Sequence, residues 1–403
     1  MLTFDLPSII NMQEAISRRE DVMLIANTPK VKAFHGGASF EFIGSRFDDL
    51  SRVDQCINAD VLDAWFDPSP MVIAKIREHL PWILRTSPPT HCEGLVQVLA
   101  EQLNVSAGNL LVGAGSSNLI FLAMLRLLSK NSKVLTLDPT YGEYNHIFEE
   151  VIGCECVKVP FLHEERGAYS LPISKLIDVI LKARPDMVTL VNPNSPTGTL
   201  ITKEELLRLR HAIPKETLLW IDETYIDYVD TSQSLIAYAA EARNTIVCKS
   251  LSKVYALSGA RSAYLCASPE IITGLSCFSP PWAVSLPAQI ATIAAVQDRD
   301  YYAKRYQETS EYRGLLAAGF RDMGFKVHDS VANFFLAEIP DRFGVASEFV
   351  QDCRRFGLYL RDISKMGSHV NKRMVRVAVK DSQTNAKILS TVKHVLTSQT
   401  QQS

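Results

Sequence analysis

The chain has 403 residues, of which 47% are hydrophobic and 21% are charged, with a net charge of −2 and a pI near 6.5. This length and apolar content are enough for a large core shared between a larger and a smaller lobe. The near-neutral charge argues against binding to nucleic acid or to an anionic membrane. No apolar run approaches the roughly 18 residues that a membrane-spanning helix requires.

The N-terminal segment has an early acidic residue and no basic start, so we expect no signal peptide. The eight cysteines are scattered without a CxxC pair, and the nine histidines show no ligand-like spacing. We therefore expect free thiols, no metal site and a cytoplasmic location.

Short β-branched runs alternate with amphipathic segments between about residues 90 and 290. This alternation predicts an α/β fold with a mainly parallel central sheet covered by helices on both faces. Helices are expected over 118–129 and 203–212. The expected strands are LLVG (110–113), KVLTLDP (133–139), MVTLVN (187–192), TLLWID (217–222), NTIVCKS (244–250) and RSAYLCA (261–267). Ligands of such sheets bind beyond the carboxyl ends of the strands.

The loop GAGSSN (113–118) joins an expected strand to an expected helix. Gly115 allows close backbone approach, and Ser116 and Ser117 lie where the amides of a helix N-terminus point outward, which suits a phosphate. Many strand–helix turns share this composition, so the loop alone is a weak signal. Tyr141 follows the next strand, where its ring can stack on a flat cofactor or pack at the sheet edge.

Asp222 ends the apolar run LLWI, and Tyr225 follows it in the segment DETY. An aspartate there can cap a turn, or it can hold a proton on a pyridine nitrogen so that the ring withdraws electrons from a bound substrate. Tyr225 can pack in the core or donate a hydrogen bond to the ring oxygen of the same cofactor. The pair indicates pyridoxal phosphate (PLP) if a suitable lysine lies nearby.

Lys253 lies in SLSKVYALSGAR (250–261), after an apolar strand and before a loop rich in serine and glycine. Most lysines are solvated, but this position suits an amine that forms an imine with the PLP aldehyde. Ser250, Ser252 and Arg261 flank it, and with the GAGSSN loop they predict a cup for the cofactor phosphate.

The alternation of expected strands and helices ends after residue 290. A long helical pattern (about 284–323) precedes expected strands at 333–339, 357–362 and 374–380 and a helix after Ser382. This pattern predicts a second, α+β lobe. We therefore divide the chain into an N-terminal arm with part of the small domain (1–85), a large PLP-binding domain (86–290) and a small domain (291–403).

Two arginines of the expected small domain are candidate ligands for a substrate anion. Arg376 lies inside an apolar strand, where an unpaired guanidinium is costly, so we expect it to bind a carboxylate. Arg361 ends the run GLYLRD and is the second candidate. Either can instead form an internal ion pair.

These motifs resemble the class I and II aminotransferases, which are fold-type I PLP enzymes, over most of the chain. The nearer likeness is to the branch that holds histidinol-phosphate aminotransferase and threonine-phosphate decarboxylase. The resemblance implies PLP, a homodimer with active sites at its interface, and the roles proposed above. It also relates NPNSPTG (192–198) to the family motif NPxNPTG, whose asparagine contacts the cofactor O3′. Ser195 stands at that place, with Asn194 one residue earlier.

Three segments bear on the substrate. LDAW (62–65) and RTSP (85–88) stand where histidinol-phosphate aminotransferases carry NENP-like and RYPD-like segments, so the tyrosine of the latter is missing. The tripeptide HGG (35–37), which begins at His35 in FHGG, resembles the HGG of threonine-phosphate decarboxylases, where the histidine lies against the substrate phosphate. A ligand-free turn is the alternative for that tripeptide.

These features favour α-decarboxylation of a small phosphorylated or phosphono amino acid. Transamination of a related amino acid is the alternative, because both reactions use the same groups and differ in which Cα bond is broken. A non-catalytic protein with the same fold is a third possibility, which the presence of Lys253, Asp222 and Arg261 disfavours.

Overall fold

The computed structural model describes residues 36–161 and 169–400, all of which belong to one structural unit. His35, and with it the predicted HGG contact, lies outside these residues. No helix among them combines the length and apolar character needed to cross a bilayer.

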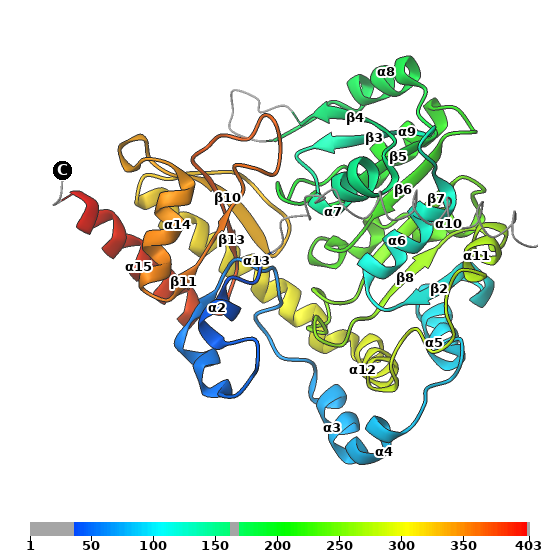
Figure 1. Ribbon diagram of the computed structural model, residues 1–403, viewed down its shortest axis with the longest axis horizontal. Coiled ribbons are helices and arrows are strands. Elements are labelled where there is room, and N and C mark those ends of the chain that lie inside the picture. Colours follow the sequence, from blue (N-terminus) through cyan, green and yellow to red (C-terminus); the bar gives the residue numbers. More distant parts are fainter. Residues whose placement is uncertain (1–35, 162–168, 401–403) are drawn as a thin grey trace, which may run out of the picture. The chain divides into compact units, whose positions relative to one another are not determined.

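A seven-stranded sheet forms the centre of the larger lobe (Figure 1), in the order β2-β8-β7-β6-β5-β3-β4. Its strands are β2 (Leu110–Gly113), β3 (Lys133–Asp138), β4 (Glu155–Pro160), β5 (Met187–Val191), β6 (Leu218–Asp222), β7 (Thr245–Ser250) and β8 (Ala263–Cys266). Neighbours from β4 to β7 are parallel, and only β8 runs against its two neighbours β7 and β2. The expected α/β fold with a mainly parallel sheet is confirmed.

Helices cover both faces of this sheet. Adjacent residues of one strand point to opposite faces, so Leu135 packs in a cluster with α8 and α9, whereas Val134 packs in another with α6. The helices of this lobe are α5 (Glu93–Leu103), α6 (Ser116–Leu127), α7 (Gly142–Asn145), α8 (Ile173–Ala183), α9 (Lys203–Ala212), α10 (Ile236–Glu241) and α11 (Pro269–Ser276). A π-helix, η3 (His146–Ile152), continues α7. With both faces buried, the strands read as continuous apolar runs.

The smaller lobe is built on an antiparallel sheet with the order β12-β13-β10-β9. Its strands are β9 (Lys326–Val327), β10 (Phe334–Glu338), β12 (Arg361–Asp362) and β13 (Met374–Ala378). The expected run 357–362 is split, because β11 (Leu358–Tyr359) pairs instead with β1 (Ile57–Asn58) near the start of the described chain. Helices α13 (Arg299–Asp322), α14 (Ala346–Arg355) and α15 (Ser382–Thr400) pack with this sheet.

The long helical pattern expected over 284–323 is two helices, α12 (Leu286–Gln297) and α13, separated at Asp298. Asp298 has φ −96° and ψ 58°, which is not helical. The segment before the large sheet holds the short helices α2 (Ser39–Ile43), α3 (Pro70–Glu78) and α4 (Leu80–Arg85), and α3 packs on α12. The division of the chain at residues 85 and 290 stays a prediction.

Candidate active site

The polar groups singled out in the sequence gather at one edge of the seven-stranded sheet. Asp222 ends β6 and Ser250 ends the adjacent β7. Ala263 of β8 pairs with both Gly113 and Ser250, so the loops that follow β2 and β7 begin side by side. This is the edge where an α/β sheet binds its ligands.

The loop after β2 forms an anion cup together with Arg261. Gly115 has φ +89°, and a Cβ at this position would overlap the Arg261 guanidinium, so only glycine lets the two approach. Helix α6 begins at the next residue, Ser116, and directs its free amides toward the loop. Arg261 is oriented by bonds that it donates to the Ser252 hydroxyl (3.3 Å) and the Ser258 carbonyl (3.1 Å).

Tyr141 stands beside this cup at the start of α7. Burial raises the pKa of its phenol to about 12, and a hydrogen bond with Ser117 acts in the opposite direction. Its ring meets that of Tyr144 edge-on, with centroids 6.0 Å apart. The ring thus lies between the loop after β2 and Tyr144, which bonds to Asp222 at the end of β6.

Asp222 is a buried carboxylate held by three donors. Oδ1 accepts from the backbone N–H (3.0 Å) and hydroxyl (2.6 Å) of Thr224, and Oδ2 accepts from the Tyr144 hydroxyl (2.8 Å). The Trp220 indole N–H donates to the same Tyr144 oxygen (2.8 Å). Because an indole only donates, the Tyr144 proton must point at Asp222. Burial raises the pKa of Asp222, and these hydrogen bonds counteract the rise.

Tyr225 is buried against Phe334, with ring centroids 5.2 Å apart. Burial raises the pKa of its phenol, Arg376 lowers it, and Tyr141 and Asp222 raise it further. The groups from β6, β13 and α7 therefore lie close enough to act on one phenol.

Two lysines four residues apart have different surroundings. Lys249 points to the opposite face of β7 from Ser250, where it forms a buried ion pair with Asp227 beside a cavity of about 780 Å³. Lys253 lies in the turn beyond the sheet edge, and its Nζ donates to Asp63 Oδ1 (2.7 Å) and to the Ser258 hydroxyl (3.4 Å). Only Lys253 lies on the side of the anion cup.

The segment 192–198 folds against the loop after β3. The Asn194 amide nitrogen donates to the Pro139 carbonyl (3.1 Å) and to the Thr197 hydroxyl (3.0 Å). Its side-chain oxygen is buried and has no partner among the described residues. The Ser195 hydroxyl oxygen instead accepts from an Arg376 Nη at 3.5 Å.

Arg361 and Arg376 face each other in register on β12 and β13. Like charges at such positions repel, and Asp60 separates them: its Oδ1 accepts from Arg361 (3.4 Å) and its carbonyl oxygen from Arg376 (3.1 Å). The internal ion pair considered for Arg361 is therefore present. Burial lowers the pKa of Arg376 to about 10, and its Nε is buried with no partner in the described chain. Asp60 also accepts from the backbone N–H of Gly37, which follows the undescribed His35.

This donor set fits PLP. The loop after β2 with Arg261 supplies donors for a phosphate dianion, and Asp222 is an oriented carboxylate for a pyridine nitrogen. The unpartnered oxygen of Asn194 leaves an acceptor at the same edge. Lys253 supplies the amine.

The sequence analysis missed four residues of this region: Tyr144, Asp60, Asp63 and Lys380. Tyr144 follows Tyr141 by one helical turn, which was a usable signal. Lys380 follows the apolar strand β13 just as Lys253 follows β7. Asp60 and Asp63 had no comparable signal, because their partners lie 301 and 190 residues away.

Comparison with known proteins places this arrangement in a family. The model of the family described as aminotransferase class I and II matches residues 65–392. A histidinol-phosphate aminotransferase of Anaeromyxobacter sp. is 32% identical over 302 residues, which cover 74% of this chain and 80% of that protein. The corresponding enzyme of Moorella thermoacetica is 30% identical over 68% of this chain and 69% of its own length.

Solved structures with the same fold include histidinol-phosphate aminotransferase from Sinorhizobium meliloti in complex with PLP. Its TM-score is 0.78 at 21% identity, and the match covers 93% of this chain and 97% of that one. L-threonine-O-3-phosphate decarboxylase from Porphyromonas gingivalis has a TM-score of 0.72 at 21% identity, over 84% and 99% of the chains. The chain is therefore an enzyme of the class I and II aminotransferase family, with the fold-type I architecture.

Proposed function

We propose that this enzyme uses PLP to transfer the amino group of a small amino acid or amine that carries an anionic group, of the histidinol phosphate type. The sequence analysis preferred decarboxylation. The two sequence relatives, from Anaeromyxobacter sp. and Moorella thermoacetica, support the alternative, transamination, better, because both are histidinol-phosphate aminotransferases.

One observation carries the proposal: an amine, an oriented carboxylate and an anion cup meet at the same sheet edge. They are Lys253 beyond β7, Asp222 at the end of β6, and Arg261 against the loop after β2. Among cofactors, PLP requires all three groups.

When bound, PLP supplies an aldehyde that condenses with an amine and a protonated ring that withdraws electrons from the bond being broken. Asp222 keeps the proton on the ring nitrogen, since its own oxygens are held by Thr224 and Tyr144. Lys253 would remove the proton from the substrate Cα and return it to C4′, the former aldehyde carbon of PLP, as a general acid and base. Arg261, Ser116 and Ser117, together with Ser250 and Ser252, would hold the phosphate.

The substrate-binding role belongs to the small domain in this proposal. Arg376 presents a buried guanidinium whose Nε has no described partner, which suits an incoming carboxylate or phosphate. Arg361 already shares Asp60, so it orients Arg376 and supplies further positive charge.

The test supplies L-histidinol phosphate, O-phosphoserine and O-phosphothreonine, each with and without 2-oxoglutarate. We expect glutamate to form with at least one donor, only when the acceptor is present, and without CO2. Release of CO2 in the absence of an acceptor would overturn transamination in favour of decarboxylation. Reduction with borohydride followed by peptide mapping checks the cofactor, and the label is expected on Lys253.

Decarboxylation remains a second candidate because one structural neighbour is a threonine-phosphate decarboxylase. A further observation is that the Gly37 N–H donates to Asp60, the residue that Arg361 and Arg376 also contact. The same assay distinguishes the two reactions.

A further inference from the structure

Asp63 is the acceptor that the described structure gives to the Lys253 amine. The two atoms, Lys253 Nζ and Asp63 Oδ1, are 2.7 Å apart, and Ser258 bonds to both side chains. Asp63 lies between β1 and α3, three residues after Asp60, and the roles discussed so far do not use it. The pair is half-buried, so the ion pair is incompletely screened by water.

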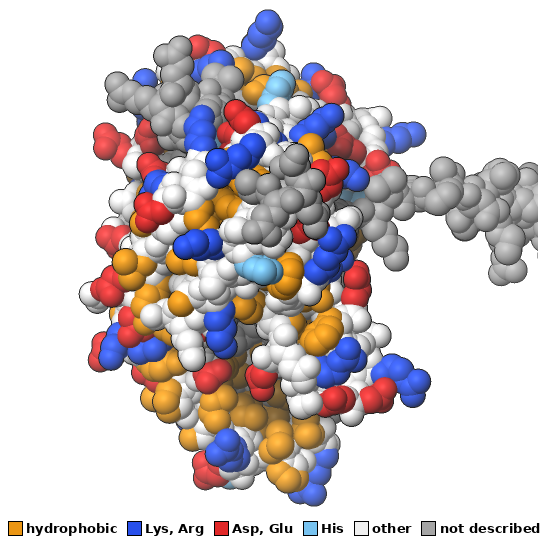
Figure 2. Space-filling model, turned by 90° about the vertical axis from the view of Figure 1, so that its left-hand side faces the viewer, with side chains coloured by type: hydrophobic (Ala, Val, Ile, Leu, Met, Phe, Trp, Pro, Cys, Tyr) orange, Lys and Arg blue, Asp and Glu red, His pale blue; other side chains and the backbone are white. Residues whose placement is uncertain are grey.

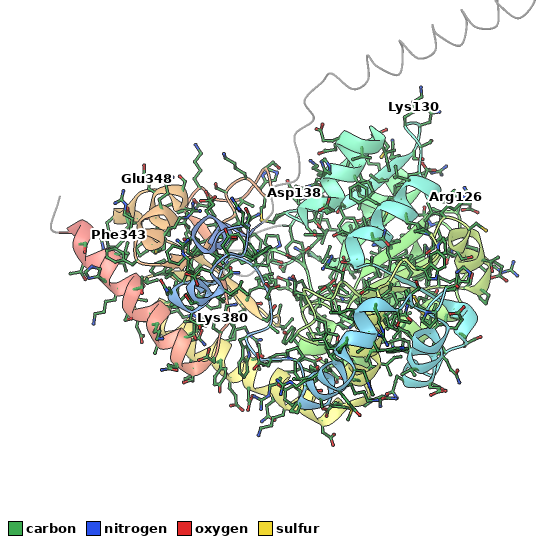
Figure 3. The ribbon with its side chains drawn as sticks, turned by 60° about the horizontal axis from the view of Figure 1, so that its bottom comes forward. Arg126, Lys130, Asp138, Phe343, Glu348 and Lys380 are labelled. Atoms are coloured by element: carbon green, nitrogen blue, oxygen red, sulfur yellow. The ribbon has the colours of Figure 1, made fainter. Side chains whose placement is uncertain are left out.

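A second amine, that of Lys380, lies near enough to Asp63 for the two charges to act on each other. Lys380 follows β13, and the backbone around it is tied down: Ala378 donates to the Ala59 carbonyl (3.1 Å), and Val379 to the Asn333 carbonyl (2.9 Å). Asn333 in turn donates to the Leu62 carbonyl (3.0 Å). These bonds hold the strand end that carries Lys380 beside the segment that carries Asp63. Figure 3 shows Lys380 on the side of the smaller lobe that is turned toward the larger one.

The charges in this cluster act on each other. Burial would raise the pKa of Asp63, but Lys253, Ser258 and Lys380 together lower it. Burial lowers the pKa of Lys380 to about 8, against the attraction of Asp63 and with the repulsion of Lys253. The other titratable groups that face the cluster are Asp381 and the phenols of Tyr225 and Tyr228.

We propose that Asp63 is a catalytic carboxylate shared by two amines: it pairs with Lys253 whenever that amine is free of the cofactor and protonated, and Lys380 serves as its counter-ion once Lys253 is neutral. The proposal rests on the role of Lys253 in the proposed function. Lys380 acts through Asp63 and is therefore a positioning residue.

The physical reason is the cost of an unpaired, half-buried charge. An amine must be neutral to attack a carbonyl carbon or to accept a proton. When Lys253 loses its charge, Asp63 would keep its hydrogen bond with Ser258 but lose its ion-pair partner, which is unfavourable in a partly desolvated site. A second ammonium nearby offsets this loss, so Lys380 makes the neutral form of Lys253 easier to reach.

This arrangement predicts opposite effects for the two neighbours of Lys253. Asp63→Asn removes the attraction that holds the ammonium and leaves the repulsion from Lys380, so Lys253 becomes more reactive. Lys380→Met removes the second ammonium, so Asp63 attracts the Lys253 ammonium without competition and Lys253 becomes less reactive. Lys380→Arg keeps the charge and should stay near the wild-type value.

The experiment measures acetylation of Lys253 by acetic anhydride near neutral pH in the full-length protein freed of cofactor. Mass spectrometry reports its rate relative to the exposed Lys372 in the same sample. We expect Asp63→Asn to raise the ratio, and Lys380→Met to lower it, by about threefold each, the scale of one partly exposed ion pair. The matched control is Asp67→Asn, an exposed carboxylate four residues further on.

Equal ratios in all variants, or shifts in the same direction for Asp63→Asn and Lys380→Met, would overturn the proposal. A general structural effect would move both ratios the same way. If Asp63→Asn does not fold, the two Lys380 variants decide the question on their own. Borohydride labelling of wild-type holoenzyme at Lys253 is read separately, so an absent label rejects the proposed function while the acetylation ratios still judge the shared carboxylate.

Discussion

Asp222 illustrates how much of this site depends on single residues. Its carboxylate is oriented by Thr224 and by Tyr144, and the direction of the Tyr144 proton is set by the donor-only indole of Trp220. Lys249 and Lys253 illustrate the same point. Lys249 lies on β7 and forms a buried ion pair with Asp227, whereas Lys253 lies in the turn beyond β7 and pairs with Asp63. Each residue's chemistry follows from the partners that surround it.

The first prediction concerns Lys253→Ala. The variant should fold, because the lysine lies in a turn rather than in the core, but its turnover should fall by a factor of at least about 1000, since the general acid and base is lost. The visible absorbance band of lysine-bound cofactor should also disappear. Turnover is measured in the coupled assay, and wild-type rates in this variant would reject the assignment. Lys249→Ala is no control, because it breaks a buried ion pair, so Lys372→Ala serves instead.

The second prediction concerns Tyr144→Phe. Losing one donor raises the already elevated pKa of Asp222, because a hydrogen bond that favours its ionised form is gone. Since Asp222 must be ionised, activity should be lost at a higher pH on the acid side than in wild type. The variant also leaves the Trp220 N–H unpaired, at a cost of about 1–3 kcal/mol.

The double variant Tyr144→Phe, Trp220→Phe separates these effects. It should recover stability, because both polar partners are replaced, yet keep the displaced acid limb of the pH profile. An unchanged acid limb in both variants would show that Tyr144 does not act on Asp222.

The third prediction uses Lys380. Its pKa in the folded protein, about 8, lies below the ordinary value of 10.5, so the unfolded chain binds more protons between these two values. Stability should therefore rise with pH across that window. Lys380→Met should be the more stable protein near pH 7, by up to about 3 kcal/mol, and the difference should shrink above about pH 10. Urea unfolding at several pH values measures it; a difference independent of pH contradicts the prediction.

At the scale of elements, the site depends on which strand ends share an edge. β8 runs antiparallel to both β2 and β7, so the ends of those two strands lie in one row through Ala263. This register brings the glycine loop and the Lys253 turn together although about 140 residues separate them. Loop 364–371 adds a contact from the smaller lobe, where Ser368 donates to Asp138 at the end of β3.

The fourth prediction concerns Gly115→Ala. The methyl group would overlap the Arg261 guanidinium, and the positive φ would strain the backbone by about 1–3 kcal/mol. We expect PLP affinity to fall by about tenfold or more, as measured by fluorescence titration. Gly274→Ala in α11 is the control, because nothing lies within 4 Å of its added Cβ, and its affinity should be unchanged. Equal affinity in both variants would remove Arg261 and this loop from the cup.

At the scale of the whole molecule, one surface carries a cluster of exposed apolar side chains. Helices α3 and α4 expose Met71, Ile73, Leu80, Trp82 and Leu84, the last at 69% of its surface. Figure 2 shows hydrophobic side chains gathered around a hollow at its lower end, where Figure 1 draws these helices. Clusters of this kind mark protein interfaces, so we propose that α3 and α4 lie at the interface of the homodimer that the family resemblance implies.

The fifth prediction tests that interface. Leu84→Glu places a charge in the apolar cluster and should convert the dimer to a monomer in sedimentation at micromolar concentration. Leu315→Glu on α13 is the matched control, because that leucine is exposed to a similar degree (70%) outside the cluster. Monomeric wild-type protein, or dissociation by Leu315→Glu alone, would contradict an interface at α3 and α4.

Local sequence patterns were enough to predict most strands of the large sheet and the candidate site residues at its edge. The apolar runs of β2, β3, β5, β6 and β7 were recognisable because strands buried on both faces are continuous in the sequence. The sequence also predicted roles for Lys253, Asp222 and Arg261, because strand ends in such sheets carry the chemistry, and these roles stay predictions. The tertiary structure alone decided that GLYLRD splits between two sheets, that the long helical pattern breaks at Asp298, and that Asp60 and Asp63 meet Arg361 and Lys253. The contacts of Asp60 and Asp63 join residues 190 or more positions apart. A local sequence pattern cannot predict which distant segment of backbone will pack beside a residue.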